Sequence, residues 1–422
     1  MDSLKLYYVK FVDQMKFLKT IKVEEFKEIL DSVPILRTDE EIVSIEGSFN
    51  RITSRDVISR INVPHFRKSR MDGYAVIAED TFGAEEDNFI KLELTEVIQA
   101  GEVPQKRLVK GQCSYVATGA AVPENANGVV MVEFTEKDGN SILISKAVTP
   151  GTYIIEIGHD IKERNEIVKK DTLIDLATMG ILASVGSKEV WVYKQPIVSL
   201  LSTGNEIVSQ DVENLEIGKI YDVNSVVLKK AIENTGVLVN YLGIVNDNYK
   251  ELKSALDKAL ETSDIVILSG GTSKGEGDLG PQVLEKYNDI EIMVHGVKIK
   301  PGKPIIFTKL KNKIIFILPG YPTSALSCFY VFIDNFLRKM SGYPLRERFS
   351  KKMEVGERIY STVGRHEFKA IKIQEVNGVK RVFPIKTGSE AISTMFYADG
   401  YIEIDELESI IEKGDKRRVY FF

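Results

Sequence analysis

Between residues 196 and 340, short apolar runs alternate with segments of helical periodicity, which limits the fold more than any other feature of the chain. The apolar runs predict strands and the segments between them predict helices. Such a βαβ series forms a mostly parallel sheet with helices on both faces. The predicted strands are IVSLLST (197–203), VLVNYLGIV (237–245), DIVILSG (264–270), EIMVHGVKI (291–299) and KIIFILPG (313–320). The predicted helices are Asn224–Asn234, Tyr249–Glu261, Pro281–Tyr287 and Thr323–Met340.

Three tight turns lie at the ends of these strands, namely SGGTSKGEGD (269–278), PGKP (301–304) and LPGYP (318–322). Open α/β sheets bind their ligands at the carboxyl ends of the strands. Glycine lets backbone N–H groups approach an anion, and serine and lysine side chains add donors. We therefore predict a phosphate or oxyanion cradle with Asp278 at its rim, although an ordinary strand–helix loop remains the alternative. The cradle residues are Ser269, Gly270, Gly271, Ser273, Lys298, Lys300 and Lys303.

The pattern of predicted strands and helices changes along the chain and predicts several domains. A chain of 422 residues is also too long to fold around a single hydrophobic core. Short β-rich runs predict small β domains on either side of the α/β region. The helix predicted near 171–186 would let the first β domain be an insertion in a helical N-terminal segment. The predicted domains are 1–60 plus 160–192 (helical), 61–159 (inserted β), 193–342 (α/β) and 343–422 (C-terminal β).

Composition excludes several classes of protein. The net charge of −5 argues against general nucleic-acid binding, and two cysteines with four scattered histidines form neither a disulfide framework nor a zinc motif. The N-terminal residues lack the pattern of a signal peptide. The longest apolar stretch, 325–337, contains Asp334 and is too short to span a bilayer. We therefore expect a soluble, cytoplasmic protein that binds neither nucleic acid nor membranes.

Seven motifs follow one another in order along the chain, namely SRMDGYAV (69–76), ATGAAVPENANGVVMVE (117–133), LSTGNEIV (201–208), GKIYDVNS (218–225), SGGTSKGEGD (269–278), HGVKIKPGKP (295–304) and LPGYPTSAL (318–326). This ordered set resembles the molybdopterin molybdenumtransferase family, which comprises the MoeA proteins and the E domains of gephyrin and its plant homologues. The resemblance covers almost the whole chain, and GRHEFKAI and GSEAISTMFYADGYIEI are similar to the family's last domain. It implies that the α/β domain 193–342 is of the molybdopterin-binding type.

The resemblance implies a reaction, which is the insertion of molybdate into adenylylated molybdopterin with Mg²⁺-dependent cleavage of the phosphoanhydride and release of AMP. It implies that Glu206, Asp222 and Asp278, each after a predicted strand end, hold Mg²⁺, and that Asp222 orients the attacking water. It also implies a homodimer in which the Asp72 loop of one subunit faces the site of its partner. Further implied substrate-binding residues are Pro319, Gly320, Tyr321, Pro322 and Ser324.

Other interpretations stay open for several of these residues. Asp222 and Asn224 are also favoured N-cap residues of the following helix, and Glu206 suits a first helical turn. Lys298 alone is typical of a solvated charge, and Asp72 before glycine is typical of a turn. A non-enzymatic scaffold and another nucleotide-handling enzyme on the same sheet are the rival functions.

The chain also departs from the family pattern, with Asn205 in STGNE and with Tyr321 and Thr323 in PGYPTSA, where the family has STGDE and PGNPVSA. These departures leave the choice between molybdate and tungstate open.

Overall fold

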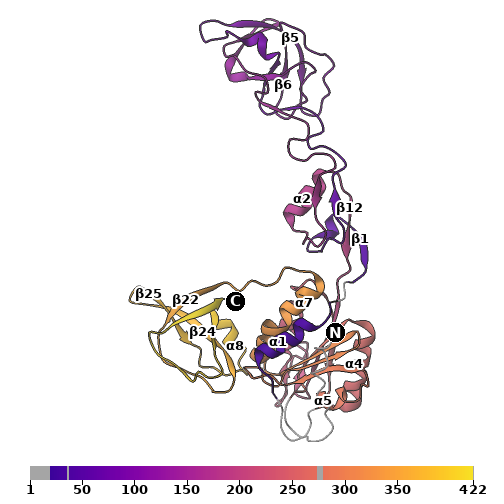
Figure 1. Cartoon of the computed structure of the whole chain (residues 1–422), viewed down its shortest axis with the longest axis vertical. Coiled ribbons are helices and arrows are strands. Elements are labelled where there is room, and N and C mark those ends of the chain that lie inside the picture. The colour runs from indigo at the N-terminus through magenta and orange to yellow at the C-terminus, as the bar shows by residue number, and fades with distance from the viewer. Residues whose placement is uncertain (1–19, 36–37, 273–278, 422) are drawn as a thin grey trace, which may run out of the picture. The chain divides into compact units, whose positions relative to one another are not determined.

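The computed structural model describes residues 20–35, 38–272 and 279–421. The chain divides into two compact units, one of residues 1–41 and 193–422 and one of residues 42–192. Figure 1 labels the principal elements of both units. In the described ranges, no helix is long and apolar enough to cross a membrane.

The first unit contains a six-stranded sheet in the order β16-β13-β17-β21-β20-β18. The first four strands are parallel, as predicted, whereas β20 and β18 continue the sheet antiparallel. The strands are β16 (Leu238–Val245), β13 (Ile197–Thr203), β17 (Ile265–Ser269), β21 (Lys313–Leu318), β20 (Ile306–Leu310) and β18 (Ile290–His295).

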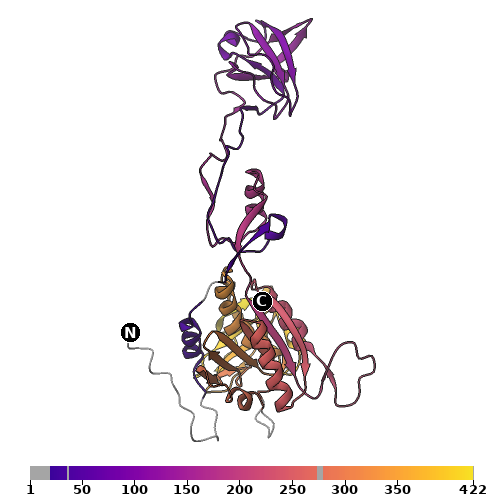
Figure 2. The ribbon, with the colours of Figure 1, turned by 90° about the vertical axis from the view of Figure 1, so that its right-hand side faces the viewer.

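Helices cover both faces of this sheet (Figure 2). Successive side chains of a strand point to opposite faces, so Ile265 and Ile267 of β17 join one core while Val266 and Leu268 join the other. Unbroken apolar runs therefore mark strands that are buried on both sides. The helices are α1 (Val23–Ser32), α3 (Val223–Glu233), α4 (Tyr249–Thr262), α5 (Leu279–Leu284), α6 (Pro322–Cys328), the π-helical η4 (Phe329–Ile333) and α7 (Asp334–Ser341).

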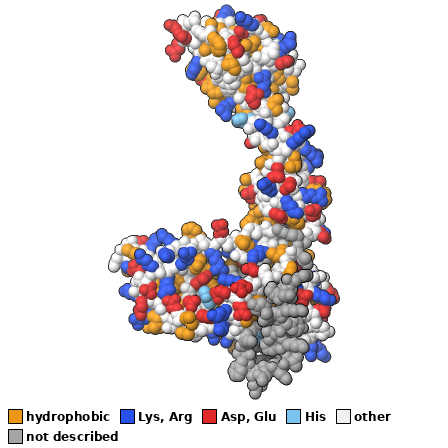
Figure 3. Space-filling view, in the orientation of Figure 1, with side chains coloured by type: hydrophobic (Ala, Val, Ile, Leu, Met, Phe, Trp, Pro, Cys, Tyr) orange, Lys and Arg blue, Asp and Glu red, His pale blue; other side chains and the backbone are white. Residues whose placement is uncertain are grey.

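The C-terminal part of the first unit is a second six-stranded sheet, and it closes on itself because β24 pairs with both β25 and β26. Its strands are β19 (Ile299–Lys300), β24 (His366–Val376), β25 (Val379–Pro384), β22 (Ser350–Val355), β28 (Lys416–Phe421) and β26 (Gly400–Ile404). The remaining short elements of this unit are β14 (Ile207–Val208), β15 (Ile220–Tyr221), β23 (Ile359–Tyr360), β27 (Ile410–Ile411) and α8 (Ser393–Tyr397). On the face shown in Figure 3, positive and negative side chains are interspersed over this part.

The second unit is mainly β-structure. Its six-stranded sheet has the order β7-β4-β6-β5-β9-β8, with β7 (Gly128–Met131), β4 (Gly73–Val76), β6 (Gln112–Val116), β5 (Ile90–Ile98), β9 (Ser141–Ile144) and β8 (Thr135–Asp138). Three two-stranded ladders pair β1 (Glu40–Ser44) with β12 (Glu189–Tyr193), β2 (Val57–Ile58) with β11 (Glu166–Val168), and β3 (Lys68–Ser69) with β10 (Ile154–Ile155). Helix α2 (Leu176–Ser184) and the short helices η1 (Glu46–Ser48), η2 (Ala78–Thr81) and η3 (Val132–Phe134) complete it.

Two expectations need correction. The segments 1–60 and 160–192 contain strands β1, β2, β11 and β12 besides α1 and α2, and α1 packs in the core of the first unit, while Leu182 of α2 packs in a core of the second. The run 291–299, predicted as one strand, is interrupted at Gly296, whose φ is +94°. Its first part forms β18, and Ile299 joins the C-terminal sheet through β19.

Candidate functional site

A cavity of about 860 Å³ lies at the carboxyl ends of the parallel strands of the first unit, where this topology places its ligands. We call it the strand-end cavity. Its wall is formed by residues at or just after the ends of β13, β16, β17 and β21, by the start of α3 and by two residues of the C-terminal part. It is lined by Ser202, Thr203, Gly204, Glu206, Ile207, Leu215, Ile220, Tyr221, Asp222, Val223, Asn224, Asp247, Ser269, Gly270, Gly271, Thr272, Pro304, Pro319, Gly320, Tyr321, Pro322, Glu390 and Ile392.

The turn after β17 requires glycine. Gly270 has a φ of +104°, and a Cβ added there would lie 2.3 Å from the carbonyl oxygen of Thr203. The N–H of Gly270 donates to the carbonyl of Leu318 at 2.9 Å. This N–H is therefore already used within the protein, whereas the predicted cradle assigned it to an anion.

Asp222 is both an N-cap and a wall residue of the cavity. Its side chain is buried and accepts the backbone N–H of Ser225 at 2.9 Å, so the capping interpretation is confirmed. Its other oxygen accepts the hydroxyl of Tyr241 at 3.1 Å. Burial, as the largest cause, raises the pKa of Tyr241, which keeps this phenol protonated as a donor. Capping and a role in chemistry are thus compatible, because the same carboxylate lines the cavity.

Asn224 joins three segments of the cavity wall. Its side-chain amide donates to the hydroxyl of Ser269 at 2.8 Å and to the carbonyl of Gly320 at 2.7 Å. The turn after β17, the turn after β21 and the start of α3 are thereby held together. The sequence indicated Asn224 only as a cap residue, since both of its partners are distant in the chain.

Asp247 is an acidic wall residue that the sequence analysis did not select. It follows the end of β16, and its carboxylate accepts the hydroxyl of Thr203 at 2.6 Å. Its backbone N–H donates to the side-chain oxygen of Asn205 at 3.1 Å. The rule that selected Glu206 and Asp222, an acidic residue after a predicted strand, would have found Asp247 as well. Asn205, a departure from the family pattern, thus helps to hold an acidic residue in place.

The described wall of the cavity is acidic, although the sequence predicted a pocket lined by cations. Its charged side chains are the carboxylates of Glu206, Asp222, Asp247 and Glu390, and no Lys, Arg or His occurs among the lining residues that the structure describes. Among all the residues that the structure describes, no three His, Cys, Asp or Glu side chains lie close enough together to hold a metal ion.

The three predicted lysines lie outside this wall. The ammonium group of Lys300 is 3.1 Å from the carboxylate of Glu367, which is buried, and 3.2 Å from the hydroxyl of Thr362. Strand β19 brings Lys300 there by pairing with β24. Lys298 and Lys303 flank this short strand.

The other predicted residues fall into three groups. Ser269, Gly271, Pro319, Gly320, Tyr321 and Pro322 line the cavity, whereas Ser324 is buried in α6 outside the lining. Asp72 belongs to the second unit, and its carboxylate accepts the backbone N–H of Thr118, 46 residues further along the chain, at 2.7 Å. Ser273 and Asp278 lie outside the described residues.

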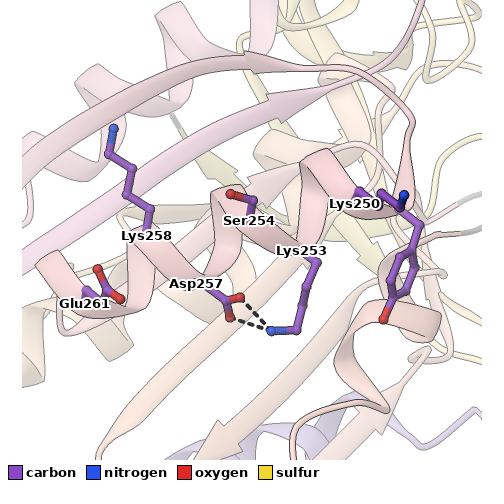
Figure 4. Close-up of a pocket in the computed structure, with 7 residues that line it drawn as sticks. Lys250, Lys253, Ser254, Asp257, Lys258 and Glu261 are labelled. Atoms are coloured by element: carbon purple, nitrogen blue, oxygen red, sulfur yellow. Dashed lines mark hydrogen bonds and ion pairs between the residues drawn. The ribbon is translucent and has the colours of Figure 1, made fainter.

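A second hollow runs along α4 (Figure 4). There the ammonium group of Lys253 is 2.7 Å from Asp257, whose carboxylate also accepts the hydroxyl of Tyr287 at 2.8 Å. Burial above all, with this hydrogen bond, raises the pKa of Tyr287. These polar groups satisfy one another on a helix surface, and no predicted motif lies here, so the strand-end cavity is the candidate site.

Comparison with known proteins supports one family over nearly the whole chain. Residues 21–186 match the MoeA N-terminal region (domain I and II), residues 199–339 match a domain described as a probable molybdopterin binding domain, and residues 352–422 match the MoeA C-terminal region (domain IV).

Individual relatives agree with these matches. A Methanocaldococcus jannaschii protein named for molybdopterin biosynthesis is 34% identical over 98% of both chains. The molybdopterin molybdenumtransferase of Haemophilus influenzae is 35% identical over 75% of this chain and 76% of its own length. Two crystal structures of molybdopterin biosynthesis MoeA proteins from Pyrococcus horikoshii superpose on this chain with TM-scores of 0.81 and 0.76 at 34% and 30% identity. Each covers 96% of this chain, and the match extends over 99% and 100% of those chains. The chain therefore belongs to the MoeA family of molybdopterin molybdenumtransferases.

Proposed function

We propose that the protein inserts molybdate, or the almost isosteric tungstate, into adenylylated molybdopterin and releases AMP, as the last step of molybdenum cofactor synthesis in the cytoplasm. The observation that carries the proposal is a cavity at the strand ends that is built from the family's motifs and walled by carboxylates. The cap of α3 accounts for one oxygen of the buried Asp222, but a purely structural scaffold has no need of four carboxylates around one cavity. Another enzyme on the same sheet would not explain the matches at 21–186 and 352–422.

The donor set of the cavity suits Mg²⁺. Hard divalent cations prefer oxygen ligands, and an acidic wall needs a cation before it can accept a pyrophosphate. Glu206 and Asp222 would hold the ion, and Asp278, outside the described residues, is the proposed third ligand. When bound, the ion would neutralise charge on the phosphoanhydride.

Asp222 is the residue proposed to orient the attacking water. Ser225 and Tyr241 each donate to one of its oxygens and so restrict the carboxylate to one orientation. A carboxylate held in this way accepts a hydrogen bond from water and directs the water oxygen at phosphorus. The bond between phosphorus and the bridging oxygen of the anhydride then breaks, the water oxygen remains on phosphorus, and the water proton is released to solvent. The products are AMP and molybdopterin, which keeps its own phosphate.

The reaction itself can be tested with purified protein, adenylylated molybdopterin and either oxyanion. We expect AMP in the supernatant and a pterin product that is heavier than molybdopterin by the inserted metal and its oxygens. Both products should depend on Mg²⁺ and be lost on adding a chelator. Chromatography of AMP and mass spectrometry of the pterin measure the two products separately, and the oxyanion that supports insertion identifies the substrate. Unchanged substrate with every oxyanion and Mg²⁺ would contradict the proposal.

We further propose a homodimer whose active sites are shared, because Asp72 and the strand-end cavity belong to different units of the chain. An Asp72→Ala subunit and an Asp222→Ala subunit are each expected to be inactive alone. Mixed under conditions that exchange subunits, they should regain activity, since one of the two sites in each heterodimer would then be intact. AMP release by the mixture measures this recovery. A monomer by light scattering, or proven exchange without recovery, would rule out the shared site.

A further inference from the structure

Tyr321 exposes an aromatic ring at the wall of the strand-end cavity. Its side chain is 59% exposed, although it lies in the turn between strand β21, whose last five residues are buried, and the mostly buried helix α6. The backbone of Tyr321 is fixed, because its carbonyl accepts the N–H of Ala325 at 2.9 Å in the first turn of α6. The position of the ring is therefore set by the turn, while nothing in the core requires an aromatic side chain here.

Other large apolar side chains of the cavity wall are exposed as well. Ile392, just before α8, is 36% exposed, and Leu215 and Ile220, on the segment between β13 and α3, are 44% and 54% exposed. Exposed apolar surface gains free energy when a ligand covers it. The same cavity carries the carboxylates of Asp222 and Asp247, which accept hydrogen bonds.

This combination restricts the kind of ligand group that fits. A tetrahedral oxyanion has no apolar surface and no hydrogen-bond donor, so it can bind at the carboxylates only through a cation such as the proposed Mg²⁺ and leaves the apolar side chains uncovered. A planar nitrogen heterocycle has two apolar faces and N–H groups at its edge. It can cover the apolar side chains with a face while its edge donates to acceptors of the wall.

We propose that Tyr321 is a specificity-determining residue that stacks on a planar nitrogen heterocycle of the substrate, with Ile392 as an apolar neighbour. This inference rests on the proposed function and deepens it, since the proposed substrate has two such heterocycles, adenine and pterin. The family pattern has asparagine at this position, so the stacking contact is a property of this chain.

The first arm of the test uses AMP and ribose 5-phosphate, which share the sugar phosphate and differ by the base. Both are titrated calorimetrically, with Mg²⁺, into the native protein and into Tyr321→Ala, Tyr321→Phe and Tyr321→Asn. If the ring stacks on adenine, Tyr321→Ala and Tyr321→Asn weaken AMP binding about tenfold and leave ribose 5-phosphate unchanged, while Tyr321→Phe retains native affinity. A general loss of site structure would weaken both ligands equally.

The second arm uses 6-hydroxymethylpterin with the same proteins and separates the two sources of the heterocycle. If the ring stacks on the pterin, Tyr321→Ala weakens this ligand about tenfold, Tyr321→Phe does not, and AMP binding is unchanged. Tyr360→Ala is the matched control, because Tyr360 is 64% exposed in the same unit and does not line the cavity. It should bind both ligands with native affinity.

Two outcomes overturn the inference in different ways. If the native protein binds AMP or the pterin and Tyr321→Ala binds both with native affinity, the stacking role is wrong while the proposed function stands. If the native protein binds neither ligand, the proposed function and the stacking role fail together.

Discussion

Asp222→Asn is expected to lower the rate of AMP release by about 100-fold or more while leaving the protein folded. The amide keeps an oxygen that accepts the N–H of Ser225, so the cap of α3 is preserved. It removes the negative charge with which we propose that Asp222 orients water and holds Mg²⁺. Single-turnover release of AMP measures the chemical step, and circular dichroism measures the unfolding midpoint.

Two further variants separate capping from chemistry. Asp222→Ala removes the cap as well and should lose about 1 kcal/mol of stability in addition to activity. Asp175→Asn is the matched control, because Asp175 caps α2 through the N–H of Thr178 at 2.8 Å, in the other unit of the chain. It should retain native activity. Native AMP release by Asp222→Asn would mean that Asp222 is a structural cap only.

Gly270→Ala is expected to lower the free energy of unfolding of the first unit by about 3 kcal/mol or more. Two costs add, namely a left-handed backbone that alanine tolerates poorly and a Cβ placed 2.3 Å from the carbonyl oxygen of Thr203. The turn must therefore shift, and with it the neighbouring Ser269 that Asn224 holds. Denaturant-induced unfolding followed by circular dichroism measures the loss, and AMP release should fall at temperatures where the variant is still folded.

Gly243→Ala provides the comparison for this prediction. Gly243, in β16 of the same sheet, has a φ of +91°, and nothing lies within 4 Å of an added Cβ. It should therefore lose only about 1 kcal/mol, which is the cost of the backbone conformation alone. Equal losses of unfolding free energy in the two variants would contradict this prediction, because they would show that the contact with Thr203 is relieved at no cost in stability.

Local patterns explain what could be predicted of the fold. The runs that form β17 and β21 are apolar over Ile265–Leu268 and Ile314–Leu318 because both faces of these strands are buried, and this composition is visible in the sequence without knowledge of any partner. The cap of α3 at Asp222 is similarly local, since it joins residues three apart. The location of the cavity at the carboxyl ends of the strands could be predicted from the topology, because parallel strands bring their carboxyl ends together.

Contacts between distant residues explain what could not be predicted. Lys300 has the sequence context of an anion ligand, yet its ammonium pairs with Glu367, which a different strand supplies. The sequence predicts α1 as part of a helical N-terminal domain, but the apolar face of α1 is buried in the core of the first unit. The residue pattern within either segment does not indicate which distant residues it contacts.

The family, the central α/β sheet and the turns that build the site could therefore be predicted from the residue pattern, because each depends on residues close together in the chain. The electrostatic character of that site could not, because it depends on contacts made only in the folded chain. Asp247 and Glu390 reach the cavity wall from other segments, and β19 carries Lys300 to Glu367. The charge of a cavity is the sum of the charges of side chains that come from separate segments of the chain. The lysine-rich turns of the sequence predicted a cationic cavity, whereas the described cavity wall is acidic.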